Sequence, residues 1–161
     1  VSSILISIAS ILVWRFYKPE HQPIPYSVYL ITPWIAISGF TSLAIGVVVT
    51  GAGPHAGDAN SPRNGLDLEI IQHLHSYPGY ITIALTLAAL LLLMRVNKDG
   101  AVKRATRITI GLFVALALQA IIGVIQANTG VPPILVGLHM LGASLISSLI
   151  TFQWLAVRAK S

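Results

Sequence analysis

Residues 70–94 read IIQHLHSYPGYITIALTLAALLLLM, an apolar stretch without a single charged side chain. As an α-helix this stretch is about 37 Å long, which exceeds the roughly 30 Å hydrocarbon core of a bilayer. Lipid offers no hydrogen-bond partner to backbone N–H and C=O groups, so a segment that crosses it forms a helix. The stretch is therefore predicted to be a transmembrane helix.

Three more stretches are long and apolar enough to cross a membrane, at about Ser27–Thr50, Ile108–Gln126 and Ile134–Val157. Only 9% of the 161 residues are charged and the mean hydropathy is +0.79, whereas soluble domains carry about 25% charged residues. We predict an all-α polytopic membrane protein with a four-helix transmembrane bundle. The chain has no cysteine, which excludes disulfides and thiolate metal sites.

The apolar run that opens the chain is shorter. Val1 to Trp14 would span about 21 Å as a helix, less than the hydrocarbon core, so we expect the end of a truncated transmembrane helix. A signal peptide is the alternative, but the basic first region and the small-residue cleavage site are missing. The predicted segments are the truncated helix 1–16, a cytoplasmic connection 17–26, the bundle 27–157 and a cytoplasmic tail 158–161.

Basic residues predict the orientation of the bundle. Nine of the ten lie in alternate connections or the tail: Arg15, Lys18, Arg95, Lys98, Lys103, Arg104, Arg107, Arg158 and Lys160. Cytoplasmic loops are enriched in Lys and Arg, so we expect these segments, including 95–107, to be cytoplasmic. Loops 51–69 and 127–133 are then extracytoplasmic. This placement explains the net charge of +5 without a nucleic-acid partner.

The sequence contains a weak internal repeat. Ile45-Gly46-Val47 precedes an outer loop and Leu74-His75, and Ile122-Gly123-Val124 precedes an outer loop and Leu138-His139. Both units have the same orientation, so a pseudo-twofold axis along the membrane normal is expected to relate them.

The repeat places two histidines at one depth. His75 and His139 lie five residues into their predicted helices, roughly 7 Å from the outer end, and imidazoles in a membrane should face the bundle interior. Such a pair suits the axial positions of a heme iron. Small neighbours leave room for a macrocycle: Pro78, Gly79, Gly142, Ala143 and Ser147. The alternative is that both histidines are hydrogen-bonded packing residues.

Other polar residues are assigned by position. His73 is two residues from His75 and points about 200° away on an ideal helix, so we expect an interfacial or inter-subunit residue. Arg63, His55, Asn60 and the loop amides are candidate partners of heme propionates, although a plain structural turn is an equal alternative. No carboxylate lies in the predicted spans, so no catalytic acid or base is predicted.

The chain from about Pro25 onward resembles the second half of bacterial heme A synthase. The resemblance rests on Val-Val-Val-Thr-Gly-Ala-Gly-Pro-His-Ala-Gly-Asp (residues 47–58), on Leu-His at 74–75 and 138–139, and on Thr-Gly-Val-Pro (129–132). It implies an oxidoreductase of two related four-helix bundles in the bacterial cell membrane. The whole enzyme converts heme O, the substrate, to heme A for terminal oxidases.

The resemblance also implies roles for this chain. His75 and His139 would be axial ligands of a b-type heme that relays electrons, and Gln72 stands where the substrate half has a carboxylate. His55, Arg63, Gln72, Gly79, Gly142 and Ala143 are then cofactor-binding candidates. The expected partners are the missing N-terminal half, the lipid bilayer, and a heme O synthase or an oxidase assembly protein. This chain alone would be an incomplete, inactive half.

Two other functions are consistent with the same residues. One is a free-standing bis-histidine membrane cytochrome that transfers electrons. The other is a non-heme structural membrane subunit in which both histidines only pack. A Glu-x-x-His pattern on further helices upstream would favour the enzyme half over the free-standing cytochrome. A heme spectrum would distinguish both of these from the non-heme structural subunit.

Overall fold

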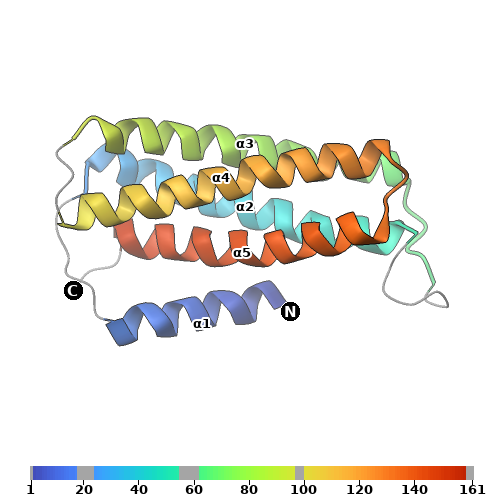
Figure 1. Ribbon diagram of the computed structural model, residues 1–161, viewed down its shortest axis with the longest axis horizontal. Coiled ribbons are helices and arrows are strands. Elements are labelled where there is room, and N and C mark those ends of the chain that lie inside the picture. The colour runs from blue at the N-terminus through green and yellow to red at the C-terminus, as the bar shows by residue number, and fades with distance from the viewer. Residues whose placement is uncertain (1, 18–23, 55–61, 97–99, 159–161) are drawn as a thin grey trace.

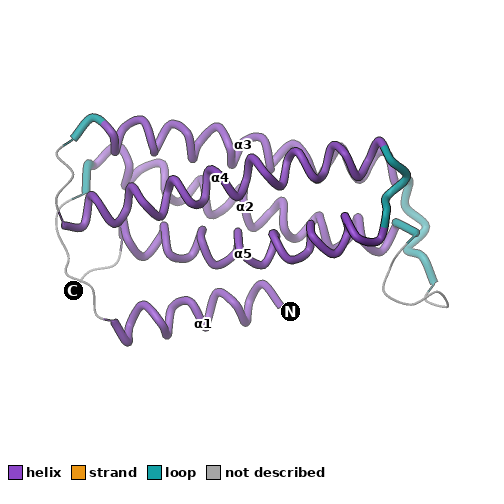
Figure 2. Tube along the Cα trace, viewed as in Figure 1, coloured by secondary structure: helices purple, strands orange, loops and turns teal. Residues whose placement is uncertain are grey.

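The computed structural model describes residues 2–17, 24–54, 62–96 and 100–158. In these ranges the chain forms five α-helices and no strand (Figures 1 and 2). They are α1 (Ser2–Tyr17), α2 (Tyr26–Ala52), α3 (Leu68–Met94), α4 (Gly100–Asn128) and α5 (Pro133–Arg158). The last four are long and apolar enough to cross a membrane, which confirms the predicted fold class.

Helices α2 to α5 form an antiparallel bundle in which α2 packs with α3 and α4 packs with α5. The α2–α3 and α4–α5 connections lie at one end of the bundle, and the α3–α4 connection lies at the other (Figure 1). We call the first the histidine end and the second the basic end. The described basic residues of the basic end are Arg15, Arg95, Lys103, Arg104, Arg107 and Arg158.

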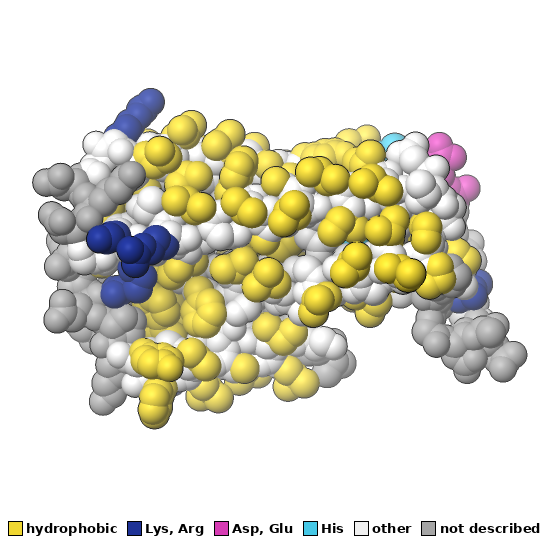
Figure 3. All heavy atoms as spheres, viewed as in Figure 1, with side chains coloured by type: hydrophobic (Ala, Val, Ile, Leu, Met, Phe, Trp, Pro, Cys, Tyr) yellow, Lys and Arg dark blue, Asp and Glu magenta, His cyan; other side chains and the backbone are white. Residues whose placement is uncertain are grey.

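The surface separates charge from apolar side chains. On the face seen in Figure 3, Lys and Arg gather mostly at the basic end and the acidic residues gather at the opposite end, with hydrophobic side chains between them. Large hydrophobics are exposed along every helix. This is the surface of a bundle whose solvent is lipid.

The connection predicted at 95–107 is shorter in the structure, because α4 already begins at Gly100. Ala101, Val102 and Ala105 are buried, whereas Lys103 and Arg107 are exposed. One face of this turn packs against the bundle while the opposite face carries charge, so the segment is an amphipathic extension of the helix. The basic residues therefore did not mark a helix end.

The two connections at the histidine end are also shorter than predicted. The loop predicted at 51–69 is shorter because α2 continues to Ala52 and α3 begins at Leu68. At the start of α3 the Asp67 side chain accepts a hydrogen bond from the Ile70 N–H at 3.0 Å. An Asp at this position satisfies one of the free N–H groups of a helix start. The loop predicted at 127–133 is shorter because α4 ends at Asn128 and α5 begins at Pro133.

Pro33 lies inside α2 and does not mark its start. Proline has no N–H to donate to the carbonyl four residues earlier, which here belongs to Tyr29. The Arg158 Nη1 atom donates to that carbonyl at 3.1 Å, and the guanidinium stacks 3.9 Å from the Tyr29 ring centroid. The end of α5 therefore satisfies a backbone group that the proline leaves free.

Helix α1 packs against α5 through serines. The fully buried Ser147 hydroxyl donates to the Ser3 carbonyl at 3.0 Å and lies 3.2 Å from the Ser7 hydroxyl. The hydroxyl oxygens of Ser10 and Ser148 are 2.8 Å apart. Small polar residues let membrane helices approach closely. Ser147 thus serves the contact with α1, although the sequence suggested that it leaves room beside His139.

Full burial is confined to one half of the bundle. The buried residues of α2 end at Gly39 and those of α4 end at Gln119, while those of α3 start at Thr82 and those of α5 start at Ile146. The closed core thus occupies the half toward the basic end. Beyond these residues, toward the histidine end, no described helical residue is buried.

Candidate heme site

His75 and His139 face each other across the half of the bundle that has no closed core. Their ring centroids are 6.0 Å apart and their planes meet at 69°. His75 is the eighth residue of α3 and His139 the seventh of α5, so both lie roughly 9–10 Å from the helix starts. The depths match as the sequence suggested, but both are greater than predicted because the two helices start earlier.

His75 is held by α2. Its Nδ1 lies 2.9 Å from the Ser42 carbonyl oxygen, so Nδ1 carries the proton and donates it. Ser42 Oγ donates in turn to the His75 carbonyl at 3.1 Å. A Cβ on Gly46 would lie 3.0 Å from His75 Cε1, so the glycine gives the imidazole its place. With Nδ1 protonated, Nε2 retains the lone pair that binds a metal.

His139 is held differently by α4. Gln119 Nε2 donates to the His139 carbonyl at 2.7 Å, and a Cβ on Gly123 would lie 3.4 Å from His139 Cε1. The Nδ1 atom of His139 is buried without a hydrogen-bond partner among the described residues. The same is true of the Gln119 Oε1 atom.

These contacts give the internal repeat a structural meaning. In each unit a glycine lies against the imidazole of the following helix, Gly46 against His75 and Gly123 against His139. Four residues before each glycine, Ser42 or Gln119 donates a side-chain hydrogen bond to the carbonyl of that histidine. The two units therefore build equivalent halves of one site.

His73 is exposed on α3, whereas His75 is half-buried, as the helical angle between them predicts. The Ser76 hydroxyl donates to the His73 carbonyl at 2.8 Å. His73 therefore lies outside the space between the two facing imidazoles.

The predicted cofactor-binding residues lie in different surroundings. Arg63 is exposed and its Nη2 donates to the Pro54 carbonyl at 2.6 Å, while His55 and Asn60 lie outside the described residues. Gln72 is half-buried near the start of α3, and Ala143 is half-buried in α5. The structure does not bring Arg63 and Gln72 into contact with the facing imidazoles.

The two predicted glycines each pack against a neighbouring helix. A Cβ on Gly79 would lie 3.4 Å from Ser42 Oγ, and one on Gly142 would overlap the Gln119 amide. The space beside each glycine is thus occupied by the residue that bonds the histidine carbonyl. These glycines let the helices that carry the two histidines pack closely against α2 and α4.

The donor set distinguishes among metal groups. No cluster of three or more His, Asp or Glu side chains suited to a metal ion exists among the described residues, whereas structural zinc needs four ligands and catalytic zinc three. A six-coordinate heme needs only two, because the porphyrin supplies the others. Two metal–nitrogen bonds of about 2 Å each put facing imidazole centroids roughly 6 Å apart, close to the separation observed.

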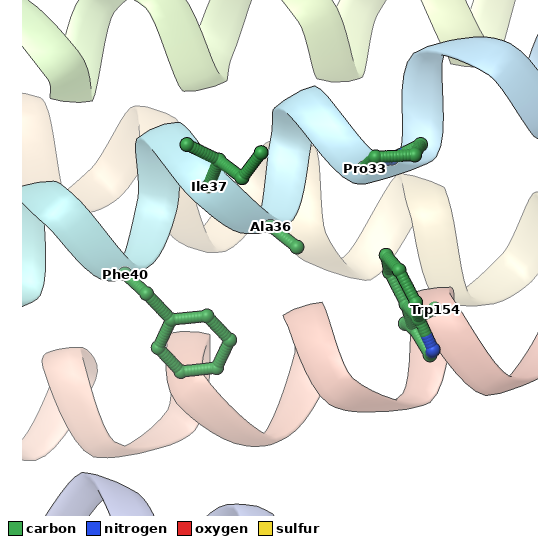
Figure 4. A pocket seen from close by; sticks show the side chains of 5 residues that line it. All are labelled: Pro33, Ala36, Ile37, Phe40 and Trp154. Carbon is green, nitrogen blue, oxygen red and sulfur yellow. The ribbon is translucent and has the colours of Figure 1, made fainter.

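An apolar groove lies elsewhere, between α2 and α5 toward the basic end. Its lining residues are Pro33, Ala36, Ile37, Phe40 and Trp154 (Figure 4). The side chains that line it offer no acid, base or metal ligand. The groove therefore adds no chemistry to the site between the histidines.

Sequence reasoning missed the residues that hold the histidines. Ser42 belonged to a stripe of small residues and Gln119 was one of several glutamines, so neither stood out. The signal was present in the repeat, because Ser42 precedes Gly46, and Gln119 precedes Gly123, by the same four residues. Comparisons of the chain with models of protein families, with curated proteins and with solved structures find no match.

Proposed function

We propose that this membrane protein binds one b-type heme between His75 and His139 and uses it for electron transfer. The observation that carries the proposal is the pair of imidazoles, 6.0 Å apart at matched depth, in the part of the bundle toward the histidine end, where the buried residues of the four helices end. A structural pair of histidines has no need of that arrangement, since packing favours a closed core.

Each residue has a role in this proposal. His75 and His139 supply Nε2 as axial ligands, Gly46 and Gly123 give the rings room, and Ser42 fixes the proton of His75 on Nδ1. The bound heme would supply one-electron redox chemistry, and two axial imidazoles favour a low-spin iron. Arg63 and His55 remain candidate partners of the propionates, and Gln72, Gly79, Gly142 and Ala143 remain candidate neighbours of the cofactor.

The resemblance described above places this heme in a larger reaction. We propose that the chain corresponds to the cofactor half of a heme A synthase in the bacterial cell membrane, with the histidine end extracytoplasmic and the basic end cytoplasmic. Heme O oxidation would then take place in an N-terminal half. What supports this is the loop at 47–58, the two Leu-His pairs and the gathering of basic residues at one end.

The experiment is a reduced-minus-oxidised spectrum of the purified full chain after reconstitution with heme. We expect a low-spin six-coordinate signal, and His75→Ala or His139→Ala should each convert it to a five-coordinate or high-spin form or release the heme. His73→Ala is the matched control and should leave the signal unchanged, because His73 is exposed on the same helix. An unchanged spectrum in both His75→Ala and His139→Ala would mean that the pair is structural.

A further inference from the structure

The two halves of the site differ in how the Nδ1 atom of the imidazole is held. His75 Nδ1 donates to the Ser42 carbonyl, but His139 Nδ1 is buried without a partner in the described chain. The residue at the equivalent position, Gln119, has a buried oxygen that is equally unsatisfied. A free donor and a free acceptor thus occur on neighbouring residues that already share one hydrogen bond.

The length of the two side chains explains the difference. Ser42 is short, so the backbone of α2 comes close enough to α3 for its carbonyl to reach the His75 ring. Gln119 is longer, and its amide fills the space between α4 and α5, with Gly142 admitting it because any Cβ there would overlap the amide. The Gln119 amide therefore corresponds to the Ser42 hydroxyl of the other unit, and no described carbonyl of α4 bonds the His139 ring.

A buried polar group without a partner costs about 1–3 kcal/mol, and buried polar atoms in proteins are nearly always paired, often through ordered water. His139 Nδ1 can donate and Gln119 Oε1 can only accept. The two groups are complementary, and a small rotation of the amide or one water molecule between them would satisfy both.

We propose that Gln119 is the positioning residue of His139 and that the two histidines are unequal. Gln119 Oε1 accepts a hydrogen bond from the Nδ1–H of His139, directly or through one water, and so selects the tautomer with the proton on Nδ1 and the lone pair on Nε2. The Nδ1 of His75 is bonded by a backbone carbonyl, which every residue at position 42 possesses, whereas His139 depends on one side chain. His139 is thus the adjustable member of the pair. Its role as the adjustable ligand rests on the heme-binding function proposed above.

The tautomer is measurable without heme, by nitrogen NMR of the full chain labelled with ¹⁵N-histidine in detergent micelles. Signals would be assigned with His75→Ala and His139→Ala. We expect both rings to be protonated on Nδ1. Gln119→Met, which has similar length and no acceptor oxygen, should move His139 toward protonation on Nε2, whereas Gln119→Glu should retain Nδ1–H. The His75 signal should stay unchanged in both variants.

Heme affinity gives the second measurement. Loss of the partner of a ligating histidine typically weakens metal binding 10- to 100-fold, so we expect that loss in Gln119→Met and recovery to within a few-fold in Gln119→Glu. Ser42→Ala is the matched control, because it leaves the carbonyl that holds His75, and should weaken binding less than Gln119→Met does.

The outcomes separate the two proposals. A His139 tautomer that is the same in the wild type and in Gln119→Met would overturn the positioning role, as would a greater loss of heme in Ser42→Ala than in Gln119→Met. If no variant and not even the wild type binds heme, the proposed function fails. The tautomer result then still decides whether Gln119 positions His139.

Discussion

Replacing Gly46 with Ala tests how tightly the two helical pairs hold their histidines. The added Cβ would lie 3.0 Å from His75 Cε1 and 3.3 Å from Nδ1, whereas the same change at Gly123 places it 3.4 Å from His139 Cε1. The first distance requires the ring to move by a few tenths of an ångström. That movement is resisted, because Nδ1 is bonded to the Ser42 carbonyl at 2.9 Å.

The magnitudes can be compared directly. Alanine in a helix interior gains about 0.5–1 kcal/mol over glycine, and overpacking a filled site costs about 1–3 kcal/mol. Gly123→Ala should therefore be neutral or slightly stabilising, because its contact is ordinary. Gly46→Ala should be less stable than Gly123→Ala by about 1–3 kcal/mol, which for a chain of this size corresponds to a melting temperature lower by roughly 2–12 °C.

The assay is thermal unfolding of the full chain in detergent, followed by circular dichroism. Gly137→Ala is the control for helix propensity, because no atom lies within 4 Å of its added Cβ. The heme affinities of the three variants should follow the same order as their melting temperatures, with Gly46→Ala lowest. Equal melting temperatures for Gly46→Ala and Gly123→Ala would refute the claim that His75 is held more rigidly than His139.

Three further predictions concern orientation, activity and the contact of α1. Cysteines introduced at Leu66 and Val96, both exposed at opposite ends of the bundle, should be labelled by a membrane-impermeant thiol reagent from opposite sides of the membrane; labelling from one side would contradict the helix count. The purified chain should not convert heme O to heme A, because no described carboxylate lies in the predicted membrane spans to act as acid or base. Heme A formed by this polypeptide alone would show that the substrate and cofactor roles are wrongly divided between the two halves. Ser147→Val should weaken the contact of α1 with α5 and destabilise the fold by about 0.5–1.5 kcal/mol, since the Ser3 carbonyl loses the hydrogen bond from Ser147 and keeps only the side-chain hydrogen bond from Ser7; proteolysis between residues 17 and 26 should then separate α1, and an α1 that stays attached would mean that the serine contacts are dispensable.

The sequence was enough to predict the number of long apolar helices and that successive helices run in opposite directions. Length and the absence of charge decide which stretches can cross lipid, and the four predicted stretches are confirmed as helices long and apolar enough to do so. The helix ends were less predictable, as residues 100–107 show. There α4 begins before the apolar run because Ala101, Val102 and Ala105 pack inward. Hydropathy alone does not reveal which side chains will contact neighbouring helices.

The histidine pair was predictable because the internal repeat placed both rings at one depth, and the facing geometry agrees with that expectation. The residues that orient the rings were not predictable in the same way. Ser42 acts through its backbone carbonyl, which every residue possesses, so its identity carries no direct signal. Gln119 acts through space that Gly142 leaves open, and only the packing of α4 on α5 reveals that relation.

The pseudo-twofold arrangement has a consequence for how such a site can evolve. A symmetric dimer of two identical hairpins would carry the same residue beside each histidine, so that both ligands would be held alike. Joining the hairpins into one chain through the short α3–α4 connection removes that constraint. Position 42 can then be a serine while position 119 is a glutamine, and one histidine can be held by a backbone carbonyl and the other by a side chain without either arrangement being imposed on its counterpart.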